Sequence, residues 1–143
     1  MKVSLVQMNS ISDKAANIAA ARALIERAVA DEGPDWVLLP ELFDWAGGNR
    51  ADKIANAETL PGGPAYSMAQ ELAAKHRVFI HAGSFMERIE GDERIHNTTV
   101  VFDRKGDEVA RYRKIERNAA SAVRKELAAL RSDIGKPKKA VGR

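Results

Sequence analysis

The sequence contains no cysteine among its 143 residues. A chain without thiols has no disulfide framework, no thiolate metal site and no cysteine nucleophile of its own. It also lacks any run of about 18 apolar residues, so we expect no segment that spans a membrane. The first residues turn polar too soon for a secretory signal, and we therefore expect a cytoplasmic protein.

Aromatic residues are few, at 6%, and none of them lies in residues 116–143. Residues 1–115 carry 15 Lys and Arg against 17 Asp and Glu, whereas residues 116–143 carry 8 against 3. The formal net charge of +3 therefore comes entirely from the end of the sequence. A basic tail on a mildly acidic body differs from a basic nucleic-acid-binding domain, so we do not expect a nucleic-acid partner.

With 45% hydrophobic and 30% charged residues, the composition is typical of one globular domain. Helices are expected over residues 14–30 and about 65–75, with strands between and after them. Ser10, Ser12 or Asp13 can cap the first helix, Gly33 can end it, and Pro64 suits the first position of the second. Strands are expected at residues 3–6, 36–40, 78–82, 84–89, 98–102 and 108–115.

The segment between residues 41 and 63 is expected to be a loop, because it is rich in glycine and proline. Short turns separate the last three predicted strands, which indicates a β-meander. The order is thus strand, helix, strand, helix, strand and then a meander. This order predicts an α/β domain built in layers.

Glu41 is the carboxylate whose position suggests chemistry. It directly follows the apolar run of residues 36–40, and the carboxyl ends of strands in α/β sheets collect ligands and catalytic groups. A carboxylate that is half-buried at such a place can have a raised pKa and can serve as a general base. The alternative is an exposed loop glutamate. Lys114, near the end of the last predicted strand, is the second candidate, but spacing does not distinguish it from Arg111 or Arg113.

Other polar residues give no pattern that indicates a metal, a cofactor or a substitute nucleophile. His76, His81 and His96 show no two-ligand spacing, and no cysteine is present to complete a zinc site. His81 lies in a predicted buried strand, where a hydrogen-bonded structural role is the common one. Ser121 and Ser132 have no histidine nearby. We therefore expect no metal and no cofactor.

Several short motifs occur in order across residues 2–115. They are Lys2–Asn9, Gly33-Pro34-Asp35-Trp36-Val37, Pro40-Glu41-Leu42-Phe43, Ala82-Gly83-Ser84-Phe85 with Glu87-Arg88, Asn97-Thr98, and Tyr112-Arg113-Lys114-Ile115. Together they resemble the N-terminal half of the nitrilase superfamily, the carbon–nitrogen hydrolases, and most closely its omega-amidase and deaminated-glutathione amidase branch. The resemblance implies a partial α-β-β-α sandwich in which one sheet edge and one apolar face are left uncovered.

The resemblance also implies a reaction, the hydrolysis of small carboxylic-acid amides. Glu41 would be the general base, Lys114 would stabilise the tetrahedral intermediate, and a cysteine would attack the amide carbon to form a thioester. The cysteine has no match, and the second catalytic glutamate of the family is replaced by the region Ala119–Ala122. We therefore expect a truncated hydrolase chain that is catalytically silent on its own.

The resemblance divides the chain into residues 1–115, half of a hydrolase domain, and residues 116–143, a divergent basic tail. Four apolar residues of the tail share one face of a predicted amphipathic helix: Val123, Leu127, Leu130 and Ile134. This helix could dock on the uncovered sheet, bind a partner through its charge, or be an accidental product of truncation or a frame change. The alternative function is a non-catalytic interaction protein that binds a paralogue or forms a homo-oligomer.

Overall fold

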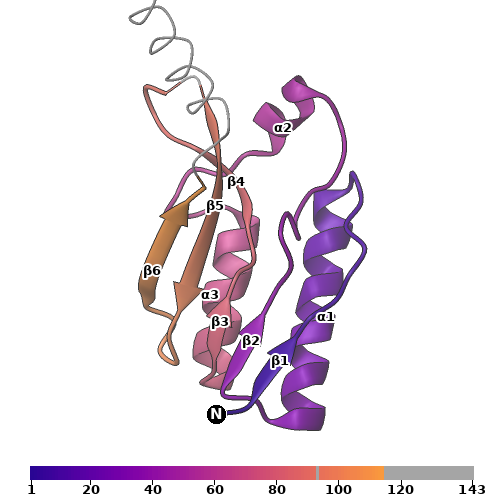
Figure 1. Cartoon of the computed structure of the whole chain (residues 1–143), viewed down its shortest axis with the longest axis vertical. Helices are drawn as coiled ribbons and strands as arrows, with labels where there is room; N and C mark the ends of the chain where they lie inside the picture. The colour runs from indigo at the N-terminus through magenta and orange to yellow at the C-terminus, as the bar shows by residue number, and fades with distance from the viewer. Residues whose placement is uncertain (93, 115–143) are drawn as a thin grey trace, which may run out of the picture.

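A computed structural model describes residues 1–92 and 94–114, so the predicted helix in residues 116–143 lies outside the described residues. Helices and strands alternate in the first part of the chain, and strands follow one another in the last part (Figure 1). The elements are β1 (Val3–Leu5), α1 (Lys14–Glu32), β2 (Trp36–Leu38), α2 (Arg50–Asn56), α3 (Pro64–His76), β3 (Phe79–His81), β4 (Phe85–Arg88), β5 (Ile95–Phe102) and β6 (Glu108–Arg113). The predicted α/β class is confirmed.

All six strands belong to one sheet, in the order β1-β2-β3-β5-β4, with β6 paired to β5. Strands β1, β2 and β3 are parallel, and helices connect them because parallel neighbours need a long crossover. Strands β4, β5 and β6 form the predicted antiparallel meander. Strands β3 and β4 both pair with β5. The short connection from β3 to β4 contains Gly83, whose φ is 45°.

The ends of the helices agree with the predicted caps. The side chain of Asp13 accepts a hydrogen bond from the Ala16 N–H at 3.0 Å and so begins α1. Gly33 ends α1 in the left-handed conformation, with φ of 54°. Pro64 is the first residue of α3, where its missing N–H leaves no hydrogen bond unmade.

Two local predictions were wrong. Helix α2 lies inside the expected loop, because Asn49 and Asp52 form a reciprocal capping box at its start. Strand β5 begins at Ile95 rather than Thr98, since Ile95 pairs with Arg88 at the far end of β4. The Asn49–Asp52 spacing was available in the sequence as a helix start signal, but the neighbouring glycines obscured it.

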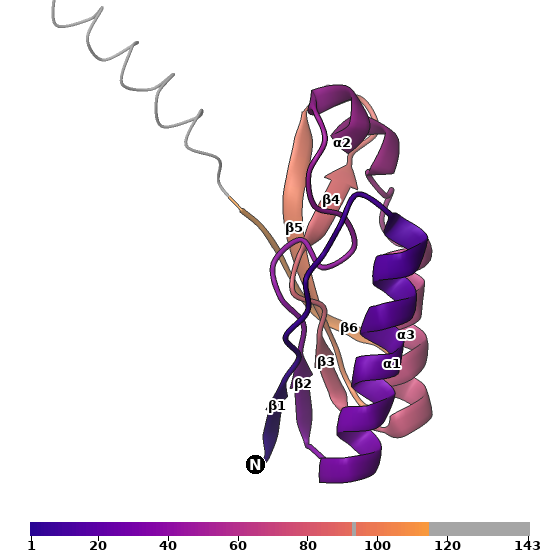
Figure 2. The ribbon, with the colours of Figure 1, turned by 90° about the vertical axis from the view of Figure 1, so that its right-hand side faces the viewer.

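Helices α1 and α3 lie side by side on one face of the sheet (Figure 2). Apolar residues from alternate strand positions pack against them, among them Val37, Ile80 and Phe102, which are fully buried. No described helix covers the opposite face, which we call the open face. Leu5 and Tyr112, whose side chains alternate to that face, are 76% and 57% exposed. Among the described residues, no helix has both the length and the apolar character needed to cross a membrane.

Candidate functional site

Glu41 and Lys114, the two residues singled out in the sequence, form an ion pair. Glu41 lies in the turn that follows β2, and Lys114 comes directly after β6. The Lys114 Nζ donates a hydrogen bond to Glu41 Oε1 at 2.7 Å across 73 residues of sequence. Both side chains are exposed, Lys114 by 58% and Glu41 by 59%. Strand alternation places this pair on the open face of the sheet.

The neighbouring arginines lie on the other face, which separates them from Lys114. Arg113 binds the buried Glu87, and Arg111 binds Glu108, whose carboxylate also accepts a hydrogen bond from Tyr66 of α3. Of Arg111, Arg113 and Lys114, the lysine is the one that strand alternation places on the face that carries Glu41. The position of the lysine in the strand, rather than its charge, distinguishes it.

The pKa of Glu41 is lowered, which agrees with the exposed loop glutamate that was the alternative interpretation and not with a half-buried carboxylate. The hydrogen bond from Lys114 is the largest cause, followed by the charge of Lys114; a hydrogen bond from Asn97 adds to them and slight burial opposes them. Burial raises the pKa by more than the hydrogen bond from Asn97 lowers it, but the two contributions of Lys114 outweigh burial. The carboxylate is therefore ionised at neutral pH, which is the form that accepts a proton.

The turn that carries Glu41 is fastened to the chain between β3 and β4. Ser84 makes three hydrogen bonds to it, involving the carbonyl of Pro40 and the N–H groups of Leu42 and Phe43, at 3.3, 3.0 and 3.2 Å. Leu42 adopts a positive φ of 51°, which bends the chain sharply after Glu41. At Gly83 the two segments approach so closely that a Cβ would overlap the Pro40 carbonyl and lie 2.7 Å from the Leu39 oxygen. A glycine is thus required beside the turn.

Asn97 of β5 contacts both members of the ion pair, although its sequence position did not mark it as a site residue. Its Nδ2 donates to Glu41 Oε1 at 2.8 Å, and its main-chain carbonyl accepts the Lys114 N–H at 2.8 Å. The residue is 9% exposed. Asn97 alternates to the open face of β5, the face that carries Glu41, but it lay before the start of the predicted strand, so the strand pattern gave no signal for it.

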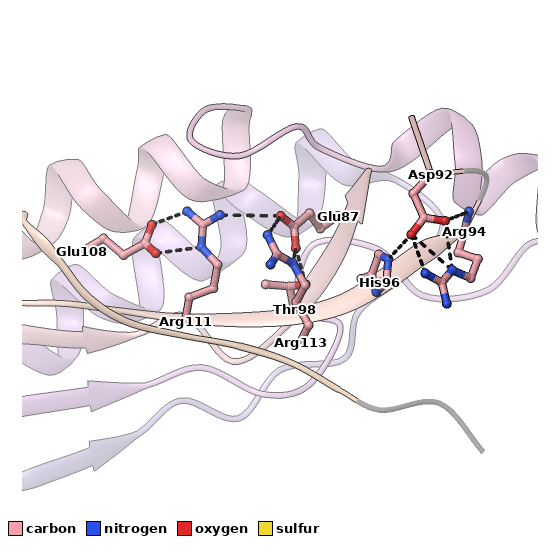
Figure 3. A network of polar contacts seen from close by, with 8 residues as sticks. All are labelled: Glu87, Asp92, Arg94, His96, Thr98, Glu108, Arg111 and Arg113. Atoms are coloured by element: carbon pink, nitrogen blue, oxygen red, sulfur yellow. Dashed lines mark hydrogen bonds and ion pairs between the residues drawn. The ribbon is translucent and has the colours of Figure 1, made fainter. Parts of the chain in front are cut away.

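A network of ionic contacts fills the helix side of the sheet near β6 (Figure 3). Glu87, which is 1% exposed, accepts hydrogen bonds from Arg113 Nε and Nη2, each at 2.7 Å, and from the Thr98 hydroxyl at 2.7 Å. Burial raises the pKa of Glu87, but the hydrogen bonds from Arg113 and Thr98 outweigh this and the net pKa is lowered. The network therefore holds β6 in place one residue before Lys114.

A second buried cluster holds the chain that follows the site. The Lys14 Nζ lies 2.9 Å from Asp44 Oδ2 and 2.7 Å from Glu58 Oε1. Glu58 also accepts the N–H groups of Ala65 and Tyr66 at the start of α3, at 2.8 and 3.1 Å. Asp44 has no exposed surface, and burial, opposed by Lys14, raises its pKa to about 6. The charge and the hydrogen bond of Lys14 only partly offset the burial of Asp44, and the neighbouring charge of Glu58 adds to it.

Replacing Asp44 by asparagine is expected to change how stability depends on pH. The folded state holds the Asp44 proton more tightly than the unfolded chain does, so ionisation of Asp44 destabilises the fold as the pH rises from about 4 towards 7, by about 3 kcal/mol in total. Urea unfolding at several pH values should show Asp44→Asn gaining stability relative to the unmodified chain over this range. Asp31→Asn, at an exposed position, is the control. Parallel curves for Asp44→Asn and the unmodified chain would contradict this assignment.

The three histidines lie in separate places. The His81 Nε2 is 2.7 Å from the Thr99 hydroxyl on the open face, and burial lowers the His81 pKa. His96 lies 3.2 Å from Asp92, and His76 is in the last turn of α3. Within residues 1–92 and 94–114 no group of three or more His, Cys, Asp or Glu side chains is arranged to hold a metal ion.

A comparison with known protein families identifies the family of this chain. The family model described as carbon-nitrogen hydrolase matches residues 2–135. The chain belongs to the carbon-nitrogen hydrolase family. This confirms the resemblance noted in the sequence, and the match extends past residue 115 into the segment that we expected to diverge.

Two curated members of the family show the similarity. The chloroplastic omega-amidase of Arabidopsis thaliana is 36% identical over 116 residues, which cover 79% of this chain and 31% of that protein. The deaminated glutathione amidase of Mus musculus is 31% identical over 115 residues, which cover 78% of this chain and 35% of that protein. The chain thus spans about a third of the length of these curated relatives.

Among solved structures, Nit3 of Saccharomyces cerevisiae, a member of branch 10 of the nitrilase superfamily, has a similar fold. It superposes with a TM-score of 0.74 at 28% identity, covering 81% of this chain and 44% of Nit3. The arrangement of one sheet with two helices on one face is therefore that of a nitrilase-superfamily domain over the part compared.

Proposed function

We propose that this chain supplies the glutamate and the lysine of a carbon–nitrogen hydrolase site, and that the nucleophilic thiol comes from outside these 143 residues. The observation that carries the proposal is the contact of Lys114 with Glu41 on the open face, at 2.7 Å. In this proposal, residues 1–115 remain the hydrolase half-domain and residues 116–143 a divergent basic tail, although the family match runs on to residue 135. Alone, the chain does not hydrolyse amides.

Each of the two side chains has one task in the proposed reaction. Glu41, ionised at neutral pH, removes the proton of a thiol, and the thiolate adds to the carbon of the amide. The electron pair of the C=O bond moves to oxygen, and the Lys114 ammonium stabilises the resulting oxyanion. The amide nitrogen leaves as ammonia with the transferred proton, and water then hydrolyses the thioester to the carboxylic acid.

The exposure of the pair supports the need for a covering segment. An ammonium and a carboxylate in water attract each other weakly, and an oxyanion gains little from a solvated cation. The same charges act more strongly where protein replaces the water. Glu41 and Lys114 are more than half exposed, so they are suited to catalysis only when another segment covers the open face.

The names of the relatives support the class of substrate. Arabidopsis thaliana has an omega-amidase and Mus musculus a deaminated glutathione amidase, and both names describe the hydrolysis of an amide. We infer a small carboxylic-acid amide, such as glutaramate, as the substrate of a site completed around Glu41 and Lys114.

A chimaera tests the proposed function. In the chimaera, residues 1–114 replace the matching part of the Saccharomyces cerevisiae omega-amidase. The alignment of the two proteins covers 80% of this chain. The chimaera should release ammonia from glutaramate, whereas the 143-residue chain should release none. Glu41→Gln and Lys114→Ala should each lower kcat/KM of the chimaera by about 10²-fold or more.

Lys105→Ala, at an exposed position in the turn before β6, is the matched control and should leave the rate unchanged. The 143-residue chain alone is expected to be inactive. If it released ammonia, and if Lys114→Ala abolished that release, this expectation would be wrong. A folded chimaera without activity would contradict the assignment of the site and would favour an interaction protein instead.

A further inference from the structure

We propose that Asn97 is a positioning residue that holds Glu41 and Lys114 in register with each other. The inference rests on the proposed function, because it assigns a further residue to the same site. Its side chain donates to Glu41 Oε1 at 2.8 Å, and its main-chain carbonyl accepts the Lys114 N–H at 2.8 Å. One residue thus contacts a turn and a strand end that lie 73 residues apart.

The two donors reach the same oxygen of Glu41. Asn97 Nδ2 and Lys114 Nζ both bind Oε1, at 2.8 and 2.7 Å. Within the described part of the chain no hydrogen bond reaches Oε2 of Glu41. Asn97 and Lys114 therefore fix one oxygen of the carboxylate, and the other oxygen is left to receive a proton in the proposed reaction.

Asn97 is the rigid member of this group. It lies inside β5, where Met86 of β4 pairs with it and the next residue, Thr98, pairs with Arg113 of β6. Glu41 and Lys114, in contrast, are long side chains with exposed ends, which lose rotamer entropy when they pair. An exposed ion pair alone holds its geometry weakly. A buried donor that contacts Oε1 from the sheet supplies the missing restraint.

The hydrogen bonds of Asn97 indicate a role in the site rather than in stability. Its Oδ1 is buried and accepts no hydrogen bond in the described part of the chain. A buried amide with one unpaired oxygen stabilises a fold poorly, because that oxygen has lost its water. Asn17, by comparison, uses both ends of its amide for main-chain groups, including the carbonyls of Ile11 and Asp44. Asn17 is a structural asparagine and Asn97 is not.

The test measures the pKa of Glu41 in the full chain by NMR titration of its side-chain carboxyl carbon, assigned with Glu41→Gln. Asn97→Ala should raise this pKa, since one donor to the ionised form is lost. Asn97→Asp, which keeps the shape of the side chain, should raise it further because a second carboxylate then faces Glu41. Asn17→Ala is the control, which lowers the melting temperature but leaves the Glu41 pKa unchanged.

The same variants in the chimaera separate this inference from the proposed function. Asn97→Ala should lower kcat/KM by about 10-fold to 100-fold and shift the acid limb of its pH profile upward, because the base is less well placed and its pKa is higher. An unchanged Glu41 pKa in both Asn97 variants would overturn the inference, whatever the activity. A shifted pKa in a chimaera that is inactive even with Asn97 would leave the inference standing and contradict the proposed function.

Discussion

Gly83→Ala is expected to destabilise the chain by about 3 kcal/mol or more, because the added methyl group would overlap main-chain atoms. The added Cβ would overlap the carbonyl of Pro40 and lie 2.7 Å from that of Leu39. Both atoms belong to the main chain, so no side-chain rotation relieves the contact. The turn that carries Glu41 would have to move away from the sheet, and urea unfolding should show the loss.

Gly33→Ala is the matched control for Gly83→Ala. Both glycines adopt a left-handed conformation, with φ of 54° at Gly33 and 45° at Gly83, but a Cβ at Gly33 would meet nothing within 4 Å. The control therefore measures the conformational cost alone, about 1–2 kcal/mol. Equal losses of stability in the two variants would show that the contact with Pro40 is unimportant.

The pairing of Glu41 with Lys114 could be predicted from the sequence in part. The end of an apolar run located Glu41, and the family resemblance located Lys114, but spacing alone left Arg111 and Arg113 open. The two-residue period of a strand separates them: Arg111 and Arg113 share one face, and Lys114 lies on the other. The choice follows once it is known which face of β6 lies on the side of the helices, which depends on the sheet and the helices together.

Contacts between distant segments could not be predicted from the sequence. Lys14, Asp44 and Glu58 form one buried cluster, yet each reads as an ordinary charged residue in its own segment. The exposure of Glu41, and with it the direction of its pKa shift, could not be chosen from the sequence for the same reason. Position at a strand end indicated a half-buried carboxylate, whereas exposure depends on what covers the open face, and no described helix lies there.

The helices and strands were better predicted, because their signals are local. Asp13, Gly33 and Pro64 act within one turn of their own helix, and the structure confirms all three. The start of β5 was misplaced because His96 and Asn97 are polar. Their place in the strand comes from pairing with β4, which a reading of local pattern does not include.

Glu87→Gln is expected to cost about 2–3 kcal/mol at neutral pH, measured by urea unfolding. The change removes the negative charge that binds Arg113 through two hydrogen bonds of 2.7 Å (Figure 3). Breaking a buried ion pair leaves the remaining charge without its partner. The loss is moderated because the Arg113 side chain is 43% exposed and water solvates part of it.

The Arg22–Glu71 pair is the matched control, because it has the same two-bond geometry at the surface, with distances of 2.9 and 2.7 Å. Glu71→Gln should leave the free energy of unfolding unchanged within error, since water solvates both Arg22 and Glu71. The pH dependence provides an independent check. The folded pKa of Glu87 is lowered, so its contribution is present above the ordinary value of 4.5 and is lost as the pH falls through the folded value. The stability difference between the unmodified chain and Glu87→Gln should therefore narrow in acid, and a difference that persists unchanged there would contradict an ionic role for Glu87.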